Sequence, residues 1–275
     1  MFCIGQTAAA FIAAVLFSTS ALAAGNALPD VASAYIVRIQ KETVWSANAQ
    51  MRLPPASLTK IMTALLVLED YHPETVVTVS TAAAAATGTR LGIGAGERFA
   101  VRDLLTATLV RSANDACFAL AQAHAGSEAR FVARMNARAV AMGLENTHFT
   151  NACGHDAASH YSSAQDLLAL ADTALLHAEF ARLIALPRAA IRARDAAGKS
   201  TRTYRFTNNN ALIGRFPGAY GVKSGYTARA GKCVIAAAER DGVKVLMVLL
   251  NARDRWWDAD ALLARAFHRA GVEVE

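Results

Sequence analysis

The sequence contains little cysteine and little charge of either sign. Its 275 residues include only four cysteines, too few for a small fold held by disulfides, and no Cys-x-x-Cys pair, which argues against a zinc ribbon or a thioredoxin-type redox site. No His-Glu-x-x-His motif occurs among the seven histidines, so we expect neither a metal nor another cofactor. Charged residues make up 18% and hydrophobic residues 54%, which excludes a disordered or fibrous chain. The net charge is +6, but the arginines are scattered along the chain, which indicates a solvated surface and no nucleic-acid partner.

A long apolar run is present only at the N-terminus. Residues 8–22 are apolar except for Ser18, Thr19 and Ser20, and Ala21-Leu22-Ala23 has the small-x-small pattern of a cleavage site. We therefore expect a signal peptide over residues 1–23 and an exported protein, periplasmic or secreted. No Lys or Arg precedes the run, which leaves an uncleaved anchor as the alternative. No later run has the length of a membrane-spanning helix, so no stable membrane anchor is expected after cleavage.

Strand patterns lie at both ends of the chain, and helical patterns lie between them. The expected strands are 34–39, 42–46, 189–193, 203–206, 221–224, 233–238 and 243–250. The expected helices are 57–68, 82–86, 101–109, 115–123, 127–143, 163–176 and 256–267. This order predicts one α/β (α+β) domain over residues 24–275. Its antiparallel sheet combines N- and C-terminal segments with flanking helices, and an all-helical subdomain is inserted at about 70–185.

The first candidate for chemistry is Ser57-Leu58-Thr59-Lys60, at the start of a helix that is apolar on nearly every face. Residues three apart share a helix face, so Lys60 lies beside Ser57. Burial lowers the pKa of a lysine and makes it a base, which a serine needs to become a nucleophile. N–H groups at the helix start can stabilise an oxyanion. The alternative is that Ser-x-x-Lys is a chance pattern.

Two further motifs follow in the chain. Ser112-Ala113-Asn114 separates two expected helices, where a hydroxyl and an amide can relay a proton and hold a substrate amide. Taken alone, the motif indicates an ordinary helix N-cap, since Ser and Asn both start helices well. Lys223-Ser224-Gly225 closes an expected strand, where it can line a cleft edge for a peptide bound as an additional strand. The alternative for this motif is an ordinary strand end followed by a turn.

Together the three motifs change the interpretation, because Ser-x-x-Lys, Ser-x-Asn and Lys-[Ser/Thr]-Gly occur in this order, each in a fitting context. With them the sequence resembles the low-molecular-mass penicillin-binding proteins, the serine-type D-alanyl-D-alanine carboxypeptidases of the β-lactamase-like superfamily. The segments that carry the resemblance are 56–64, 112–116, 131–136 and 160–164, within a match that runs from about residue 30 to about 268.

The resemblance implies a role for each matching residue. Ser57 would be the acylated nucleophile, Lys60 its base, and Ser112 the donor of a proton to the leaving amine. The substrate would be bound by Asn114, Lys223, Ser224, Gly225, Tyr226 and Arg255, with Arg253 as the alternative to Arg255 for holding its carboxylate. The backbone N–H groups of Ser57 and Tyr226 would form the oxyanion hole. The implied partners are peptidoglycan stem peptides and β-lactam antibiotics.

The sequence departs from the family at two points. Ser224 replaces the usual threonine but keeps the hydroxyl, and about fifty residues follow Lys223, so we expect neither a C-terminal β-rich domain nor a membrane anchor. The leading hypothesis is a serine D,D-carboxypeptidase. The alternatives are a D,D-endopeptidase with the same residues, a β-lactamase, and a catalytically silent cell-wall binding protein. For a β-lactamase, Glu145-Asn146-Thr147-His148 does not match the expected Glu-x-x-Leu-Asn pattern.

The remaining candidates favour structural roles. Cys117, Cys153 and Cys233 could form one disulfide, and the sequence does not identify the pair; buried thiols are the alternative, which fits Cys117 and Cys233 on apolar elements. His155 and His160 do not have the spacing of a zinc site, and His160 is expected to pack beside Tyr161.

Overall fold

Segments from the two ends of the chain form one antiparallel sheet. The structure is a computed structural model that describes residues 30–70 and 72–274, so the expected signal peptide at 1–23 lies outside the described residues. The sheet has the strand order β2-β1-β9-β8-β7, with every neighbouring pair antiparallel. Its strands are β1 (Ala32–Ile39), β2 (Glu42–Ala47), β7 (Ala219–Thr227), β8 (Gly231–Arg240) and β9 (Val243–Ala252). Strand β7 is an end strand, so one of its edges has no neighbour in the sheet.

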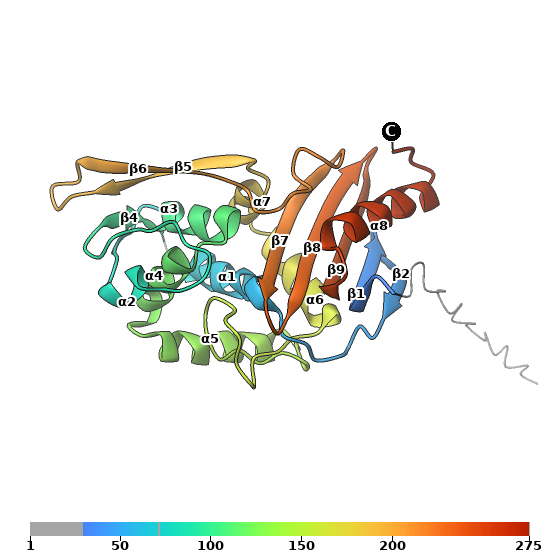
Figure 1. Ribbon diagram of the computed structural model, residues 1–275, viewed down its shortest axis with the longest axis horizontal. Coiled ribbons are helices and arrows are strands. Elements are labelled where there is room, and N and C mark those ends of the chain that lie inside the picture. The colour runs from blue at the N-terminus through green and yellow to red at the C-terminus, as the bar shows by residue number, and fades with distance from the viewer. Residues whose placement is uncertain (1–29, 71, 275) are drawn as a thin grey trace, which may run out of the picture.

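The two central strands are buried on both faces. A tight turn joins β8 to β9, and its residues Asp241 and Gly242 have φ values of 49° and 75°, as a two-residue hairpin turn with positive φ requires. Six consecutive residues of each strand are buried, because helix α8 (Arg255–Arg269) covers one face and the helical part of the molecule covers the other (Figure 1). Two apolar cores result, a small one under α8 and a large one between the sheet and the inserted helices.

The large core surrounds helix α1 (Lys60–Asp70), whose residues from Lys60 to Val67 are all buried. The Ser127 and Ser163 side chains cap two of the helices around it by accepting hydrogen bonds from Arg130 N and Asp166 N. The helical elements before α8 are η1 (Ala56–Thr59), α1, α2 (Thr81–Ala84), α3 (Val101–Thr106), η2 (Ala107–Arg111), α4 (Asn114–Ala125), α5 (Glu128–Ala141), α6 (Ala164–Leu175) and α7 (Ala178–Ile184). No helix within residues 30–70 and 72–274 is long and apolar enough to cross a membrane.

A second sheet, with the order β3-β4-β5-β6, lies on the inserted region and was not predicted as a sheet. Its strands are β3 (Val76–Thr78), β4 (Arg98–Ala100), β5 (Arg188–Arg194) and β6 (Ser200–Thr207). The inserted region is therefore mostly helical but contains two short strands, β3 and β4. These two strands were not expected, because three residues are too few for an alternating pattern to be recognised. Helix α7 was not expected either; it has only seven residues, about two helical turns. Strands β5 and β6 form a long hairpin that runs over α3 and projects beyond it (Figure 1).

Candidate active site

The predicted nucleophile lies on a tight turn at the start of the buried helix. Residues 56–59 form a 3₁₀ turn, and Ala56 has a φ of 49°, a left-handed conformation that is uncommon for a residue with a side chain. Two glycines make room for this turn. A Cβ atom on Gly154 would lie 1.9 Å from Ala56 O, and one on Gly225 would lie 2.9 Å from Ser57 N. The absence of a side chain at Gly225 therefore permits the close approach of β7 to this turn.

Lys60 is completely buried and lies beside Ser57. Its Nζ is 2.9 Å from Ser57 Oγ and donates a hydrogen bond of 2.5 Å to the carbonyl oxygen of Cys153. Burial lowers the pKa of Lys60 well below its usual value, and the positive charge of Lys223 lowers it further. A neutral amine within hydrogen-bond distance of a hydroxyl can accept the proton of that hydroxyl.

The second motif lies at the junction of two helical segments, as predicted. The π-helical turn η2 ends at Arg111, and Ser112 follows it with a φ of 63°. Turns of this kind are frequent at functional sites. Asn114 begins α4, and its Nδ2 donates to Thr87 O at 2.6 Å and lies 3.2 Å from His155 Nε2. The Oδ1 atom of Asn114 is buried and has no hydrogen-bond partner within the described residues.

The third motif lies inside β7 rather than at its end, because the strand continues to Thr227. Lys223 is buried, and its Nζ donates to Ser224 O at 2.9 Å. Burial lowers the pKa of Lys223 to about 7, with a further contribution from the nearby charge of Arg255. Ser224 is also buried, and its hydroxyl donates to Asn209 O at 3.4 Å. Strand β7 is an end strand, and its Gly225 packs against the turn at Ala56 and Ser57.

A cleft with a volume of about 320 Å³ brings the three motifs together. It is lined by Ser57, Thr89, Ser112, Asn209, Ser224, Gly225, Tyr226, Arg255 and Trp256. Lys60, Asn114 and Lys223 are not among the lining residues and lie buried behind them. None of the described residues that line the cleft is acidic, so its electrostatic character is set by cations and hydroxyl groups.

Arg255, rather than Arg253, contributes to this cleft. Its Nη1 donates to Gly225 O at 2.5 Å, and its guanidinium stacks 4.8 Å from the Trp256 ring. Burial lowers the pKa of Arg255 from its usual value, and the Nε atom has no partner within the described part of the chain. Arg253 lies at a separate cavity next to Asn251.

Three residues near the cleft were missed as functional candidates. Thr89 lies far from any motif in the sequence. Asn209 lies within the run Asn208-Asn209-Asn210; its Nδ2 donates to Arg111 O at 2.7 Å, and its Oδ1 accepts from Arg111 Nη1 at 2.9 Å. Asn209 therefore connects the second motif with β7. That run of three asparagines between two strands was the one available sequence signal.

Asp115, the third of these residues, organises the loop that faces Asn114. Its completely buried carboxylate accepts hydrogen bonds from the backbone N–H groups of Leu91, Gly92, Ile93 and Ala116, the shortest being 2.8 Å. The same loop supplies Thr87 O and Thr89 O, which accept from Nδ2 and the backbone N of Asn114. By binding this loop, Asp115 positions the two carbonyl groups that accept hydrogen bonds from Asn114.

His160 has a structural environment, as expected, but with a different neighbour. Its ring packs against Phe149 at 5.8 Å, while the Tyr161 ring packs against His148 at 6.0 Å. His160 Nδ1 accepts from Thr150 N, and Nε2 lies 2.8 Å from Thr59 Oγ1. Burial lowers the pKa of His160 to about 4, so the ring is neutral at neutral pH and donates from Nε2 to the nucleophile helix.

A disulfide links Cys117 to Cys153 and closes a loop with a sequence separation of 36 residues. The expectation of a buried free thiol is therefore wrong for Cys117 and confirmed for Cys233, which is buried and unpaired. The bridge joins α4 to the segment whose carbonyl group accepts from Lys60. It therefore fixes the position of Lys60 relative to the second motif.

Removing this disulfide should destabilise the protein. A variant with Cys117→Ala and Cys153→Ala should lose about 3 to 4 kcal/mol of unfolding free energy, because the unfolded chain regains the entropy of an open loop. Denaturant unfolding measures the loss. The control is Cys233→Ala, which removes an unpaired cysteine and leaves the disulfide intact. Equal stability of the bridged protein with and without a reductant would contradict the expectation.

Comparison with known proteins agrees with this geometry. The family model described as D-alanyl-D-alanine carboxypeptidase matches residues 23–254. The carboxypeptidase DacF of Bacillus subtilis is 33% identical over 224 residues, which cover 78% of this chain and 56% of DacF. DacB2 of Mycobacterium tuberculosis is 31% identical, over 76% of this chain and 72% of its own length. This chain thus spans little more than half of DacF but most of DacB2.

Solved structures show the same fold. The DD-transpeptidase of Streptomyces K15 superposes with a TM-score of 0.81 at 27% identity, over 87% of this chain and 98% of that protein. The carboxypeptidase DacD of Francisella tularensis gives a TM-score of 0.74 at 28% identity, over 86% of this chain and 70% of that protein. With its motifs gathered at one cleft and the family model matched over most of its length, this chain belongs to the D-alanyl-D-alanine carboxypeptidase family.

Proposed function

We propose that the protein is an exported serine D,D-carboxypeptidase that removes the terminal D-alanine from peptidoglycan stem peptides. The observation that carries the proposal is the completely buried amine of Lys60, 2.9 Å from Ser57 Oγ and directly behind an open cleft. A buried amine with a lowered pKa, in contact with a serine hydroxyl, is one arrangement that activates a serine for acyl transfer. The family's name and the names of its relatives supply the substrate class.

Acylation begins with a proton transfer. Lys60 Nζ accepts the hydroxyl proton as Ser57 Oγ attacks the carbonyl carbon of the penultimate D-alanine. The backbone N–H groups of Ser57 and Tyr226 stabilise the oxyanion of the tetrahedral intermediate. Ser112 passes a proton to the amine of the leaving D-alanine, and the amide bond breaks. Water then attacks the acyl-enzyme, and hydrolysis regenerates the Ser57 hydroxyl.

The remaining residues bind the substrate. The peptide extends along the free edge of β7, as an additional strand would, so its backbone pairs with the segment 224–226. Asn114 holds a substrate amide, with its unpartnered Oδ1 as the group that has hydrogen-bonding capacity to spare. Lys223, Ser224 and Arg255 place positive charge and a hydroxyl where the terminal carboxylate of the substrate lies.

Covalent labelling tests the proposal. A β-lactam should acylate Ser57, because its strained amide resembles the substrate and its opened ring cannot diffuse away. Mass spectrometry of penicillin-treated protein should show one adduct on the Ser57 peptide and none in Ser57→Ala. The wild type should also release D-alanine from a pentapeptide that ends in D-Ala-D-Ala. No adduct, together with no release, would refute a serine D,D-peptidase.

A cross-linked dimeric peptide in the same assay distinguishes an endopeptidase, since its cleavage uses the same residues but leaves no free D-alanine. Transfer of the acyl group from Ser57 to an added amine, instead of to water, would indicate transpeptidation. That is the activity in the name of the Streptomyces K15 relative. Rapid nitrocefin turnover would indicate a β-lactamase. The cleft gives no support for a class A β-lactamase, because those enzymes activate water with a glutamate and no acidic residue is among the lining residues described.

A further inference from the structure

The β5–β6 hairpin collects arginines that are scattered in the sequence onto one face. Arg188, Arg192 and Arg194 alternate along β5 and therefore share a face, and Arg205 of β6 joins them because it pairs with Ala190. The opposite face is buried against the core through Ile191, Ala193, Tyr204 and Phe206. We call Arg188, Arg192, Arg194 and Arg205 the arginine track. The arginines were expected to be scattered over a solvated surface, but on this hairpin the strand register brings four of them onto one face.

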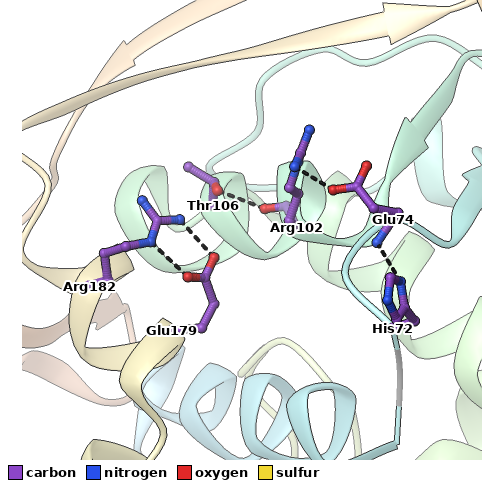
Figure 2. Close-up of polar contacts among 6 residues, drawn as sticks. All are labelled: His72, Glu74, Arg102, Thr106, Glu179 and Arg182. Carbon is purple, nitrogen blue, oxygen red and sulfur yellow. Dashed lines mark hydrogen bonds and ion pairs between the residues drawn. The ribbon is translucent and has the colours of Figure 1, made fainter.

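The arginine track differs from neighbouring arginines because, among the described residues, none of its members forms an ion pair. Figure 2 shows Arg102 paired with Glu74 and Arg182 paired with Glu179 just below the hairpin. Within residues 30–70 and 72–274, no carboxylate lies within ion-pair distance of a track arginine. Asp103 is the acidic group that faces Arg192 and Arg194, and its burial raises its pKa. Like charges on neighbouring positions of a two-stranded ribbon repel each other, so a bound anion would stabilise this face.

The track lines a concave surface rather than a flat one. Arg192, Arg194 and Arg205 border a cavity of about 260 Å³ together with Arg102, Asp103 and Thr203. The described residues around this cavity include no aromatic or large aliphatic side chain. Membrane-binding faces combine basic residues with Trp, Phe or Leu, which insert into the lipid. The composition and the concave shape therefore favour an extended anionic polymer over a bilayer surface.

The track also begins near the cleft. Strand β6 leads from the cavity to Asn209, which lines the cleft. Arg205 precedes Asn209 by four residues and Thr203, the partner of Arg192, by six, so at most about 13 Å and about 20 Å of chain separate them from Asn209. A polymeric substrate with one peptide in the cleft carries further peptides outside it, and these have carboxylate groups of their own.

We propose that the arginine track is a second binding site, which holds carboxylate groups of the peptidoglycan polymer outside the cleft. The proposal rests on the function proposed above, because that function makes this polymer the substrate. Guanidinium groups pair with carboxylates through two parallel hydrogen bonds, and several such pairs along one strand add their affinities. The track therefore acts on polymeric substrate and leaves the chemistry on a short peptide unchanged.

A paired-substrate experiment tests the track. In the full-length protein, Arg192→Ala with Arg205→Ala should weaken cosedimentation with purified sacculi roughly fivefold and raise KM on polymeric substrate to a similar extent. The kcat/KM for a short D-Ala-D-Ala peptide and the penicillin adduct on Ser57 should stay unchanged. The matched control is Arg215→Ala with Lys41→Ala, which removes the same charge from exposed positions outside the hairpin. Arg192→Lys with Arg205→Lys should keep most of the binding, because it keeps the charge.

Four outcomes distinguish the track from its alternatives and from the proposed function. When the carboxylates of the sacculi have been converted to amides, the wild type and the double alanine variant should bind these sacculi equally weakly. If the variant binds untreated sacculi as well as the wild type, the track is overturned, even if the enzyme is fully active on peptides. If the wild type binds anionic vesicles through these arginines and ignores sacculi, the partner is a membrane and the proposal is also overturned. If the wild type binds sacculi but does not cleave the short peptide, the proposed function is refuted and the proposed binding site stands.

Discussion

Lys60→Met should abolish most activity while making the protein more stable. The change removes the base from Ser57, and a positioned general base contributes about 10² to 10⁴ in rate, so the acylation rate should fall by about that factor. Methionine has a similar length and no charge to bury, so the unfolding free energy should rise by about 1 to 2 kcal/mol at neutral pH. Stopped-flow acylation by a chromogenic β-lactam and denaturant unfolding measure the two effects.

The sign of the pH dependence follows from the direction of the Lys60 pKa. In the folded state this pKa lies well below its usual value, so the folded protein binds fewer protons than the unfolded chain between the two values. Lys60 therefore reduces stability increasingly as the pH falls through that interval, and Lys60→Met removes this contribution. In the wild type, acylation should likewise decline as the pH falls through the folded-state pKa, because the protonated amine cannot act as a base.

Lys232→Met is the matched control, since Lys232 is an exposed lysine on β8 whose Nζ donates to Arg253 O. That variant should differ little from the wild type in acylation and in stability. Acylation of Lys60→Met within tenfold of the wild type would show that Lys60 is not the base.

Asp115→Ala should cause the largest loss of stability among single substitutions near the cleft. Four backbone N–H groups would lose a completely buried acceptor, and each unpaired buried donor costs about 1 to 3 kcal/mol, partly recovered by water that enters the space. We expect a loss of about 3 to 5 kcal/mol in unfolding free energy. Acylation should also slow, because the loop that positions Asn114 is no longer held.

Asp195→Ala is the control for Asp115→Ala. Asp195 accepts a backbone hydrogen bond from Lys199 at 2.8 Å at the exposed end of the β5–β6 hairpin, where water replaces a lost partner. Its loss should cost less than about 1 kcal/mol. Similar losses in the two variants, measured by denaturant unfolding, would refute the role assigned to Asp115.

The sequence was most informative where the chemistry is local. Ser57 and Lys60 lie one helical turn apart in a strongly apolar segment, so their proximity and the burial of the amine could be predicted without a fold. The order of the remaining motifs then indicated the family and, through it, Ser112, Asn114, Lys223 and Arg255. The strands of the main sheet were also predictable, because long apolar runs and the Asp241-Gly242 turn mark them clearly.

What the sequence did not show depends on contacts between distant segments. Thr89 and Asn209 reach the cleft only through the packing of their loops, and the pairing of Cys117 with Cys153 depends on how α4 meets a loop 36 residues later. Arg192 and Arg205 are thirteen positions apart, and only the hairpin register brings them to one face. Strands of three residues, such as β3, carry too little pattern to be recognised.

The position of β7 at the end of its sheet restricts how this protein can associate with others. An unpaired strand edge is open to any extended chain, and many proteins block such an edge with a further strand, a bulge or a proline. Here the edge next to Ser57 has to remain accessible, since a permanent cover would exclude substrate from the cleft. Self-assembly through this edge would therefore inactivate both copies, whereas a non-cleavable extended peptide that pairs with it would be a reversible inhibitor that needs no reactive group.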